Sequence, residues 1–201
     1  MKLIRFMFLI LATSAYFAVT TGPTKAQSAN KTTCFSTNSD NYKLEEFYSR
    51  GLAACDQEIS SGNYSGKKLA PVLRTKAYWL RKMNRLDDAL LLYDRAIELD
   101  PSNAEGYDYR GGTWLQKGDN DRALTDYSMA IRVEPAYASA YYLRGTIYQA
   151  IGKLDLAKSD YLAAIALPAK TAEHDERLGV WAKQQAQAKL NELAKDGTDK
   201  K

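Results

Sequence analysis

The side chains that most often carry out chemistry in proteins are scarce in this sequence of 201 residues. It contains a single histidine, His174, and two cysteines, which do not make up any familiar set of zinc ligands. The sequence has no phosphate-binding glycine loop, nucleophile elbow or paired-histidine metal motif. We therefore expect no catalytic residue, no metal site and no cofactor, and predict that the chain is not an enzyme.

Oppositely charged residues recur at one spacing. Arg110 stands sixteen residues before Asp126, and Arg144 stands sixteen residues before Asp160. Thirty-four residues before the first pair are Lys76 and Leu92, which cannot form such a pair. We predict ion pairs that orient neighbouring helices and that contribute about 0–1 kcal/mol each if they are exposed.

The first 26 residues have the layout of a secretory signal peptide. Lys2 and Arg5 precede an apolar run over residues 6–19, and a polar stretch leads to Ala26, after which we predict cleavage. The alternative is an uncleaved membrane anchor, but the run is shorter than the ~20 residues that a spanning helix needs. The expected location is the bacterial periplasm or the extracellular medium.

Export bears on the two cysteines and on the net charge. Cys34 and Cys55 are expected to form a disulfide, worth roughly 3 kcal/mol, since exported proteins mature in an oxidising compartment. Two free thiols are the alternative.

The whole chain has 28 basic and 24 acidic residues, but three of the basic ones lie in residues 1–26, which leaves a charge of +1 on the rest of the chain. A nearly neutral domain gives little reason to expect nucleic acid as a partner.

The elements that position these residues repeat along the chain with a period of 34. Glycine recurs at 111, 145 and 179, and proline at 101 and 135. Four further columns keep the same phase: Ala89, Ala123 and Ala157; Tyr93, Tyr127 and Tyr161; Ala96, Ala130 and Ala164; and Ile97, Ile131 and Ile165. Six columns in phase indicate three structural repeats, over residues 70–103, 104–137 and 138–171.

Each repeat has the pattern of an antiparallel helical hairpin. In the second repeat, Tyr107, Arg110, Gly111 and Trp114 fall on one face of a first helix. A break at residues 117–119 precedes a second helix with its own apolar face. Small residues at fixed places, such as Gly111 and Gly145, indicate that the two helices approach closely, because glycine inside a helix is otherwise unfavourable.

This pattern closely resembles the tetratricopeptide repeat (TPR) family, and the stretch from the first cysteine-bearing helix onward resembles exported TPR proteins of alphaproteobacteria. The middle repeat carries the residues of the family pattern: Tyr107, Gly111, Trp114, Ala123, Tyr127, Ala130 and Pro135. The resemblance covers residues 70–171 and implies an all-α fold, a right-handed solenoid of hairpins. The departures are Leu80 in place of an aromatic residue and Pro168 one place early.

The flanking segments complete the predicted organisation. An N-terminal segment, residues 27–43, precedes a partial repeat helix with its linker, residues 44–69. Gly51, Cys55 and Ile59 there have the mutual spacing of Ala89, Tyr93 and Ile97. Residues 172–194 are expected to form a capping helix with a buried stripe at Leu178, Ala182, Ala186, Leu190 and Leu193. Residues 195–201 are expected to be a disordered tail.

The resemblance implies a concave groove lined by the first helix of each repeat. One tyrosine per repeat faces it, and we expect a peptide to lie along it with its acidic end near the basic residues of the first repeat. The alternative is that these tyrosines are buried between repeats and bind nothing. The predicted partner-binding residues are Arg74, Tyr78, Arg81, Lys82, Asp108, Tyr109, Gln116, Tyr142, Thr146 and Gln149.

The sequence thus predicts an exported interaction module or adaptor that binds a protein or peptide of unknown identity. A membrane-tethered envelope assembly factor is the alternative, and an enzyme on a helical-repeat scaffold is less favoured. The two-carboxylate clamp of the chaperone-binding subgroup is not expected, because Tyr78, Tyr109, Ser139 and Leu143 occupy four of its places.

Overall fold

The computed structural model of the chain describes residue 34 and residues 44–168 and 176–198. Residues 1–33, which include the predicted signal peptide, and residues 35–43 and 199–201 lie outside the described residues. So does the connection at residues 169–175, which includes His174. All described residues belong to one structural unit, within residues 32–201.

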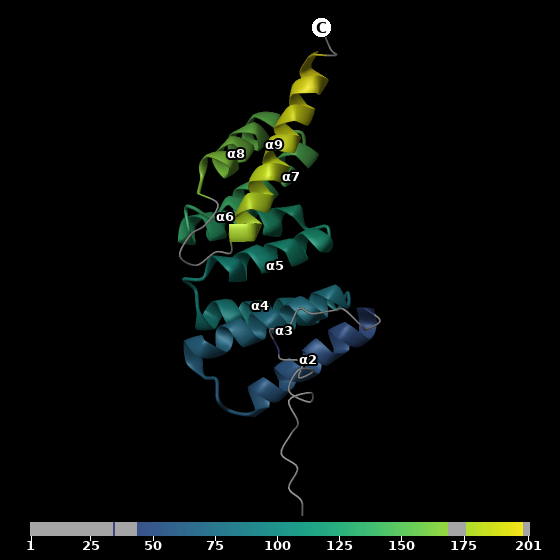
Figure 1. The fold of residues 1–201 in the computed structure, drawn as a ribbon, viewed down its shortest axis with the longest axis vertical. Coiled ribbons are helices and arrows are strands. Elements are labelled where there is room, and N and C mark those ends of the chain that lie inside the picture. Colours follow the sequence, from purple (N-terminus) through teal and green to yellow (C-terminus); the bar gives the residue numbers. More distant parts are fainter. Residues whose placement is uncertain (1–33, 35–43, 169–175, 199–201) are drawn as a thin grey trace, which may run out of the picture. The chain divides into compact units, whose positions relative to one another are not determined.

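The described elements are helical, and successive helices lie side by side in chain order (Figure 1). Each predicted repeat contains two of them: α3 (Ala70–Lys82) and α4 (Leu86–Leu99), α5 (Ala104–Gln116) and α6 (Asn120–Val133), and α7 (Ala138–Ala150) and α8 (Leu154–Ala166). Before them come α2 (Leu44–Ser60) and the short 3-10 helix η1 (Gly66–Leu69), and after them α9 (Glu176–Thr198). The predicted all-α solenoid of hairpins is confirmed.

The turn inside each hairpin has one recurring geometry. Asn84, Gly118 and Gly152 have positive φ angles of 59°, 82° and 77°, and they too are 34 residues apart. In each case the next residue donates its N–H to a carbonyl in the last helical turn, as Asp119 does to Trp114 at 2.9 Å. This is a Schellman motif, which favours glycine or asparagine at the left-handed residue. The repeat period therefore fixes the turns as well as the helices.

The core of each hairpin is a tyrosine packed against small residues. Tyr93, Tyr127 and Tyr161 are completely buried, as are Ala89, Ala123 and Ala157 of the same helices. A Cβ added at Gly145 would lie 2.8 Å from Cε1 of Tyr161, and one at Gly111 would lie 3.2 Å from Cε1 of Tyr127. The close approach that the small residues predicted is present.

Helix α2 packs against α3 as a second repeat helix would. The indole of Trp79 fills the space above Gly51, whose added Cβ would lie 2.7 Å from that ring. Lys76 of α3 forms an ion pair with Asp56 of α2, just as Arg110 of α5 pairs with Asp94 of α4. The contact of α2 with α3 is therefore of the same kind as the contact between successive complete repeats, such as that of α4 with α5.

The two cysteines lie at this end of the array. Their sulfur atoms are 2.11 Å apart, and both residues are completely buried. The indole Nε1 of Trp79 donates a hydrogen bond to the carbonyl oxygen of Cys34 at 3.2 Å. The structure therefore places the pair at bonding distance against the first repeat, and formation of the disulfide in the exported protein stays a prediction.

Helix α9 differs from the predicted capping helix at its C-terminal end and in the exposure of Leu178; the predicted start at residue 172 lies outside the described residues. It extends to Thr198, so the predicted end at residue 194 is four residues too early and the predicted disordered tail begins inside the helix. Ala182, Ala186 and Leu193 are buried against α7 and α8, as expected for the stripe. Leu178, however, is 37 % exposed and does not belong to that core.

Candidate functional site: a groove pocket

The first helices of the three repeats and the start of α9 enclose a pocket of about 600 Å³, which we call the groove pocket. Most of the side chains that line it are aromatic or aliphatic. They are Thr75, Tyr78, Trp79, Arg74 and Arg81 from α3; Asp108, Tyr109, Gly112 and Leu115 from α5; Tyr127 from α6; Ser139 and Leu143 from α7; and Leu178 and Trp181 from α9.

Two of the three predicted groove tyrosines line this pocket. The rings of Tyr78 and Tyr109 lie on neighbouring first helices with centroids 6.4 Å apart and planes tilted by 51°. The third, Tyr142, is only 9 % exposed, because Trp181 of α9 packs edge-on against its ring at 5.2 Å. The expectation that each repeat offers one tyrosine to a partner is therefore wrong for the third repeat.

The basic end predicted for an acidic ligand is largely occupied within the chain. Arg74 forms an ion pair with Glu105 at 2.6 Å, and both side chains are mostly buried. Arg81 and Lys82 lie over the ring of Tyr78, with their charged groups 5.8 Å and 5.4 Å from its centroid. The pocket wall thus lacks the open cluster of cations that was expected for an acidic peptide end.

The remaining predicted residues lie outside the pocket lining. Gln116 donates to Asn84 at 3.2 Å. The hydroxyl of Thr146 donates to the carbonyl of Leu143 at 2.6 Å, and Gln149 accepts a hydrogen bond from Tyr161 at 2.7 Å. Each thus has a partner within the solenoid, and a role in partner binding stays a prediction for them.

Asp108 is the most unusual group of the pocket wall. Its carboxylate is 8 % exposed; Oδ2 accepts a hydrogen bond from the Tyr137 hydroxyl at 3.1 Å, and Oδ1 has no hydrogen-bond partner among the described residues. Burial raises the pKa of this carboxyl to about 7; the Tyr137 hydrogen bond and Arg81 oppose that rise, whereas Glu105 adds to it. The residue was predicted to face the groove, but not to be buried.

This carboxyl makes stability depend on pH. An unfolded Asp ionises near pH 4, so between about pH 4 and pH 7 the folded chain holds a proton that the unfolded chain has lost. Binding of this proton favours the folded state, so the free energy of unfolding falls as the pH rises from about 4 to about 7. We expect Asp108→Asn to be more stable than the parent, by an amount that grows by about 2–3 kcal/mol between pH 5 and pH 8. Urea unfolding at both pH values measures this, and a constant difference would contradict it; Asp121→Asn, at an exposed position, is the control.

Sequence reasoning missed the contributions of α9 and of two buried rings. Leu178 was assigned to the buried stripe of the capping helix, yet it lines the pocket, and so does Trp181 of the same helix. Tyr127 belongs to the hairpin core, but its hydroxyl reaches the pocket wall. Trp79 had no assigned role. Helical phase assigns its neighbour Tyr78 to the groove but not Trp79 itself; the large indole ring of Trp79 nevertheless reaches the groove pocket.

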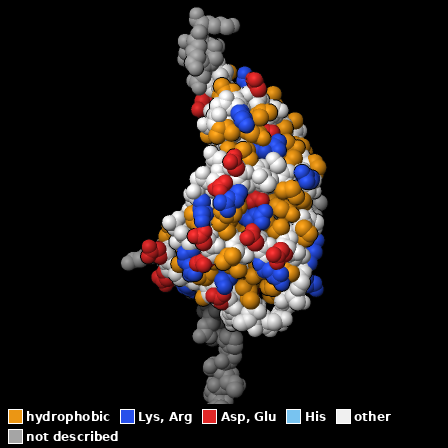
Figure 2. Space-filling view, turned by 180° about the vertical axis from the view of Figure 1, so that it is seen from behind, with side chains coloured by type: hydrophobic (Ala, Val, Ile, Leu, Met, Phe, Trp, Pro, Cys, Tyr) orange, Lys and Arg blue, Asp and Glu red, His pale blue; other side chains and the backbone are white. Residues whose placement is uncertain are grey.

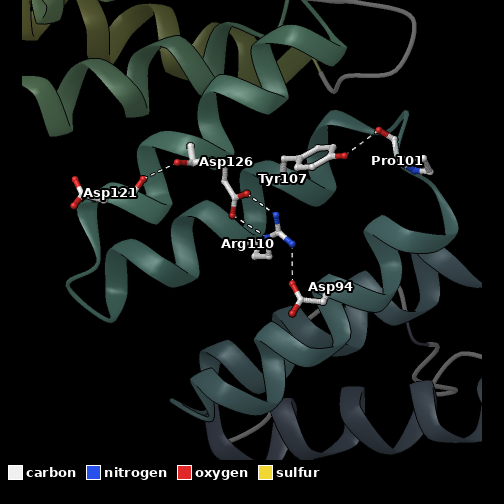
Figure 3. Close-up of polar contacts among 7 residues, drawn as sticks. Asp94, Pro101, Tyr107, Arg110, Asp121 and Asp126 are labelled. Carbon is white, nitrogen blue, oxygen red and sulfur yellow. Dashed lines mark hydrogen bonds and ion pairs between the residues drawn. The ribbon is translucent and has the colours of Figure 1, made fainter.

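The predicted ion pairs are confirmed, and they hold the helices that carry the pocket. Arg110 donates two hydrogen bonds to Asp126 of its own repeat, at 2.7 Å and 2.9 Å, and a third to Asp94 of the preceding repeat at 2.7 Å (Figure 3). Arg144 makes the same pair of bonds with Asp160, and its third partner is Ser128. Asp126 and Asp160 are buried, so these pairs are not the exposed ones that the sequence estimate assumed.

The surface agrees with a nearly neutral domain. On the face shown in Figure 2, basic and acidic side chains are interspersed with apolar ones. Within the described ranges, no group of three or more His, Cys, Asp or Glu side chains could hold a metal ion. In the same part of the chain, no helix is both long enough and apolar enough to cross a membrane.

Stacked helical hairpins joined by Arg–Asp pairs define the chain as an α-solenoid, one of the helical-repeat proteins. Family models described as tetratricopeptide repeat match residues 75–132 and 138–171, and another, described as TPR repeat, matches residues 115–152. The chain is therefore a tetratricopeptide repeat protein. Proteins with this repeat are typically non-enzymatic scaffolds that bind other proteins.

Solved structures show the same fold. MamA aligns with a TM-score of 0.53 and 18% identity over 77% of this chain and 99% of that one. YrrB, described as a TPR protein with an unusual peptide-binding site, aligns at 0.52 and 21% identity over 70% and 68% of the two chains. The TPR domain of Arabidopsis OM64 aligns at 0.50 and 21% identity over 62% and 98%. A comparison with curated proteins gave no significant match. At these identities the similarity shows a shared fold alone.

Proposed function

We propose that the chain is an adaptor that binds a segment of a partner protein in the groove pocket. The observation that carries this proposal is the pocket itself, because its volume of about 600 Å³ and its mostly apolar lining are those of a binding site rather than of a packing defect. It is lined chiefly by α3 and α5, with further side chains from α6, α7 and α9.

The lining also has the composition of an interface. Tyrosine and tryptophan provide large rigid contact areas with few rotatable bonds, and Tyr78, Tyr109 and Trp181 present such areas around one cavity. Charges at the wall are balanced: Arg74 pairs with Glu105, and Arg81 stands opposite Asp108. Such a site favours a protein segment over a nucleic acid, whose binding depends on unpaired cations.

The test uses Tyr78, one of the two predicted groove tyrosines that line the pocket. Tyr78→Ala removes a wall of the pocket, and we expect it to reduce capture of the partner from an extract of the native host at least tenfold, since such central aromatic contacts dominate binding energy. Tyr64→Ala, in the linker before η1, is the matched control and should capture as the parent does. Equal capture by parent and Tyr78→Ala, with unchanged helix content, would remove the groove as the site.

The proposed location is the bacterial periplasm. Support comes from the signal-like residues 1–26 and from the cysteine pair at bonding distance, which suits an oxidising compartment. A membrane-tethered assembly factor would retain those 26 residues. The intact mass of the protein isolated from its host distinguishes the two, because cleavage after Ala26 removes the whole segment and tethering does not.

A further inference from the structure

Gly112 is a glycine that the fold itself does not require. It lies inside helix α5, where glycine is less stable than alanine. A Cβ added there would lie 3.6 Å from both Nη1 of Arg81 and the hydroxyl oxygen of Tyr127, which is ordinary contact. Its neighbour Gly111 differs, since an added Cβ would lie 3.2 Å from Cβ of Asp126 inside the hairpin. Packing therefore explains Gly111 and leaves Gly112 unexplained.

The pocket supplies the explanation. The equivalent residues of the neighbouring repeats are Tyr78 and Thr146, so the second repeat alone has no side chain at this place. Gly112 lines the groove pocket, as Tyr78 and Tyr109 do, and an added Cβ would point toward Arg81 and Tyr127, which line it too. A side chain as large as that of Tyr78 at position 112 would therefore take up part of the pocket.

The polar groups around this opening describe the occupant. Oδ1 of Asp108, Nε of Arg81 and the hydroxyl oxygen of Tyr127 are buried, and none has a hydrogen-bond partner among the described residues. All three residues line the pocket. They include a donor, on Arg81, and an acceptor, on Asp108, so a partner group that carries both an acceptor and a donor would satisfy them. Burying a charged side chain there would be unfavourable, whereas a neutral peptide group carries both a donor and an acceptor.

We propose that the space above Gly112 receives one large uncharged side chain, aromatic or aliphatic, from an extended partner segment, and that Gly112 determines this specificity. The inference rests on the proposed function. The aromatic walls supply apolar contact to the inserted side chain, and the neighbouring peptide groups of the segment face Arg81 and Asp108. The recognised feature is thus a side chain within the segment rather than a terminal carboxylate.

The probe is a phage-displayed library of random heptapeptides, selected on the purified full chain. We expect enrichment of Trp, Phe, Tyr, Leu, Ile or Met at one position, with charged residues depleted there. Gly112→Leu should weaken binding of the selected peptides at least tenfold, and Gly112→Ala should weaken it less without lowering the melting temperature. Thr125→Leu, at an exposed place of α6 outside the pocket, is the matched control and should bind as the parent does.

Three results would count against the inference. Peptides dominated by acidic or basic residues, or dependent on a free C-terminal carboxylate, would overturn it while leaving the groove as a binding site. Unchanged affinity in Gly112→Leu and Gly112→Ala would overturn the role of this residue. If no peptide is enriched over an unrelated control protein, the proposed function fails and the inference fails with it. Should Gly112→Leu not fold, Gly112→Ala decides alone, because its Cβ fits without displacement.

Discussion

Replacing Gly145 by leucine is expected to lower the melting temperature of the protein by about 10 °C, from a loss of about 3 kcal/mol or more in the free energy of unfolding. Even the first carbon of a side chain at this place would lie 2.8 Å from Cε1 and 3.0 Å from Cδ1 of Tyr161. Tyr161 is completely buried and cannot move aside without opening the third hairpin. Thermal unfolding followed by circular dichroism measures the change.

Two glycines of α5 calibrate this result: Gly111, which is equivalent to Gly145, and its neighbour Gly112. Gly111→Ala meets contacts at 3.2 Å and should cost less than Gly145→Leu, whereas Gly112→Ala meets contacts at 3.6 Å and should be neutral or stabilising. The order of melting temperatures is therefore Gly112→Ala, then Gly111→Ala, then Gly145→Leu. A Gly145→Leu protein that melts with its parent would show that the hairpin helices do not meet as described.

Replacing Arg110 by alanine is expected to destabilise the protein by about 3 kcal/mol. The loss exceeds that of an ordinary ion pair because Asp126 is only 2 % exposed and would keep its carboxylate without a guanidinium. Burial already raises the pKa of Asp126 and Arg110 opposes that rise, so removal of Arg110 raises the pKa further. The loss should therefore shrink as the pH falls, since a protonated carboxyl tolerates burial better. Urea unfolding at pH 8 and pH 5 tests both statements.

The chain supplies its own compensating variant. In the first repeat Leu92 stands at the place of Asp126, and that hairpin folds without the pair. Arg110→Ala combined with Asp126→Leu should therefore recover most of the loss, because it removes the buried charge along with its partner. Arg95→Ala, which breaks an exposed pair with Glu98, is the control and should change stability by less than about 1 kcal/mol. Equal losses for Arg110→Ala and Arg95→Ala would contradict the account.

The repeats could be predicted from the sequence because their contacts are local and recur at a fixed period. Gly145 against Tyr161, and Arg144 against Asp160, are contacts within one hairpin, and helical phase is sufficient to place them. Their strength could not be predicted in the same way. The sequence gives no measure of exposure, so a strength could be given only for the case of exposed pairs, whereas Asp160 is only 5 % exposed.

The groove was predicted less completely, because its walls depend on how distant helices meet. The burial of Tyr142 follows from the position of Trp181, which belongs to a helix that the family pattern does not describe. The position of α9 on α7 and α8 closes one end of the groove and brings Leu178 to the pocket. Asp108 is buried for a related reason, since Tyr137, which precedes α7, packs its hydroxyl against the carboxyl group. Helical phase assigns a face to each residue but not what packs against that face.

The central claim is that partners bind in the groove pocket, and crosslinking from defined positions in the native host tests it most directly. A photoreactive phenylalanine analogue placed at residue 78 lies in the pocket wall, and the same analogue at residue 91, on α4, replaces a leucine that is 68 % exposed outside that pocket. We predict covalent adducts with a partner protein from position 78 and none from position 91. Adducts from position 91 alone, or equally from both positions, would contradict the groove as the binding surface.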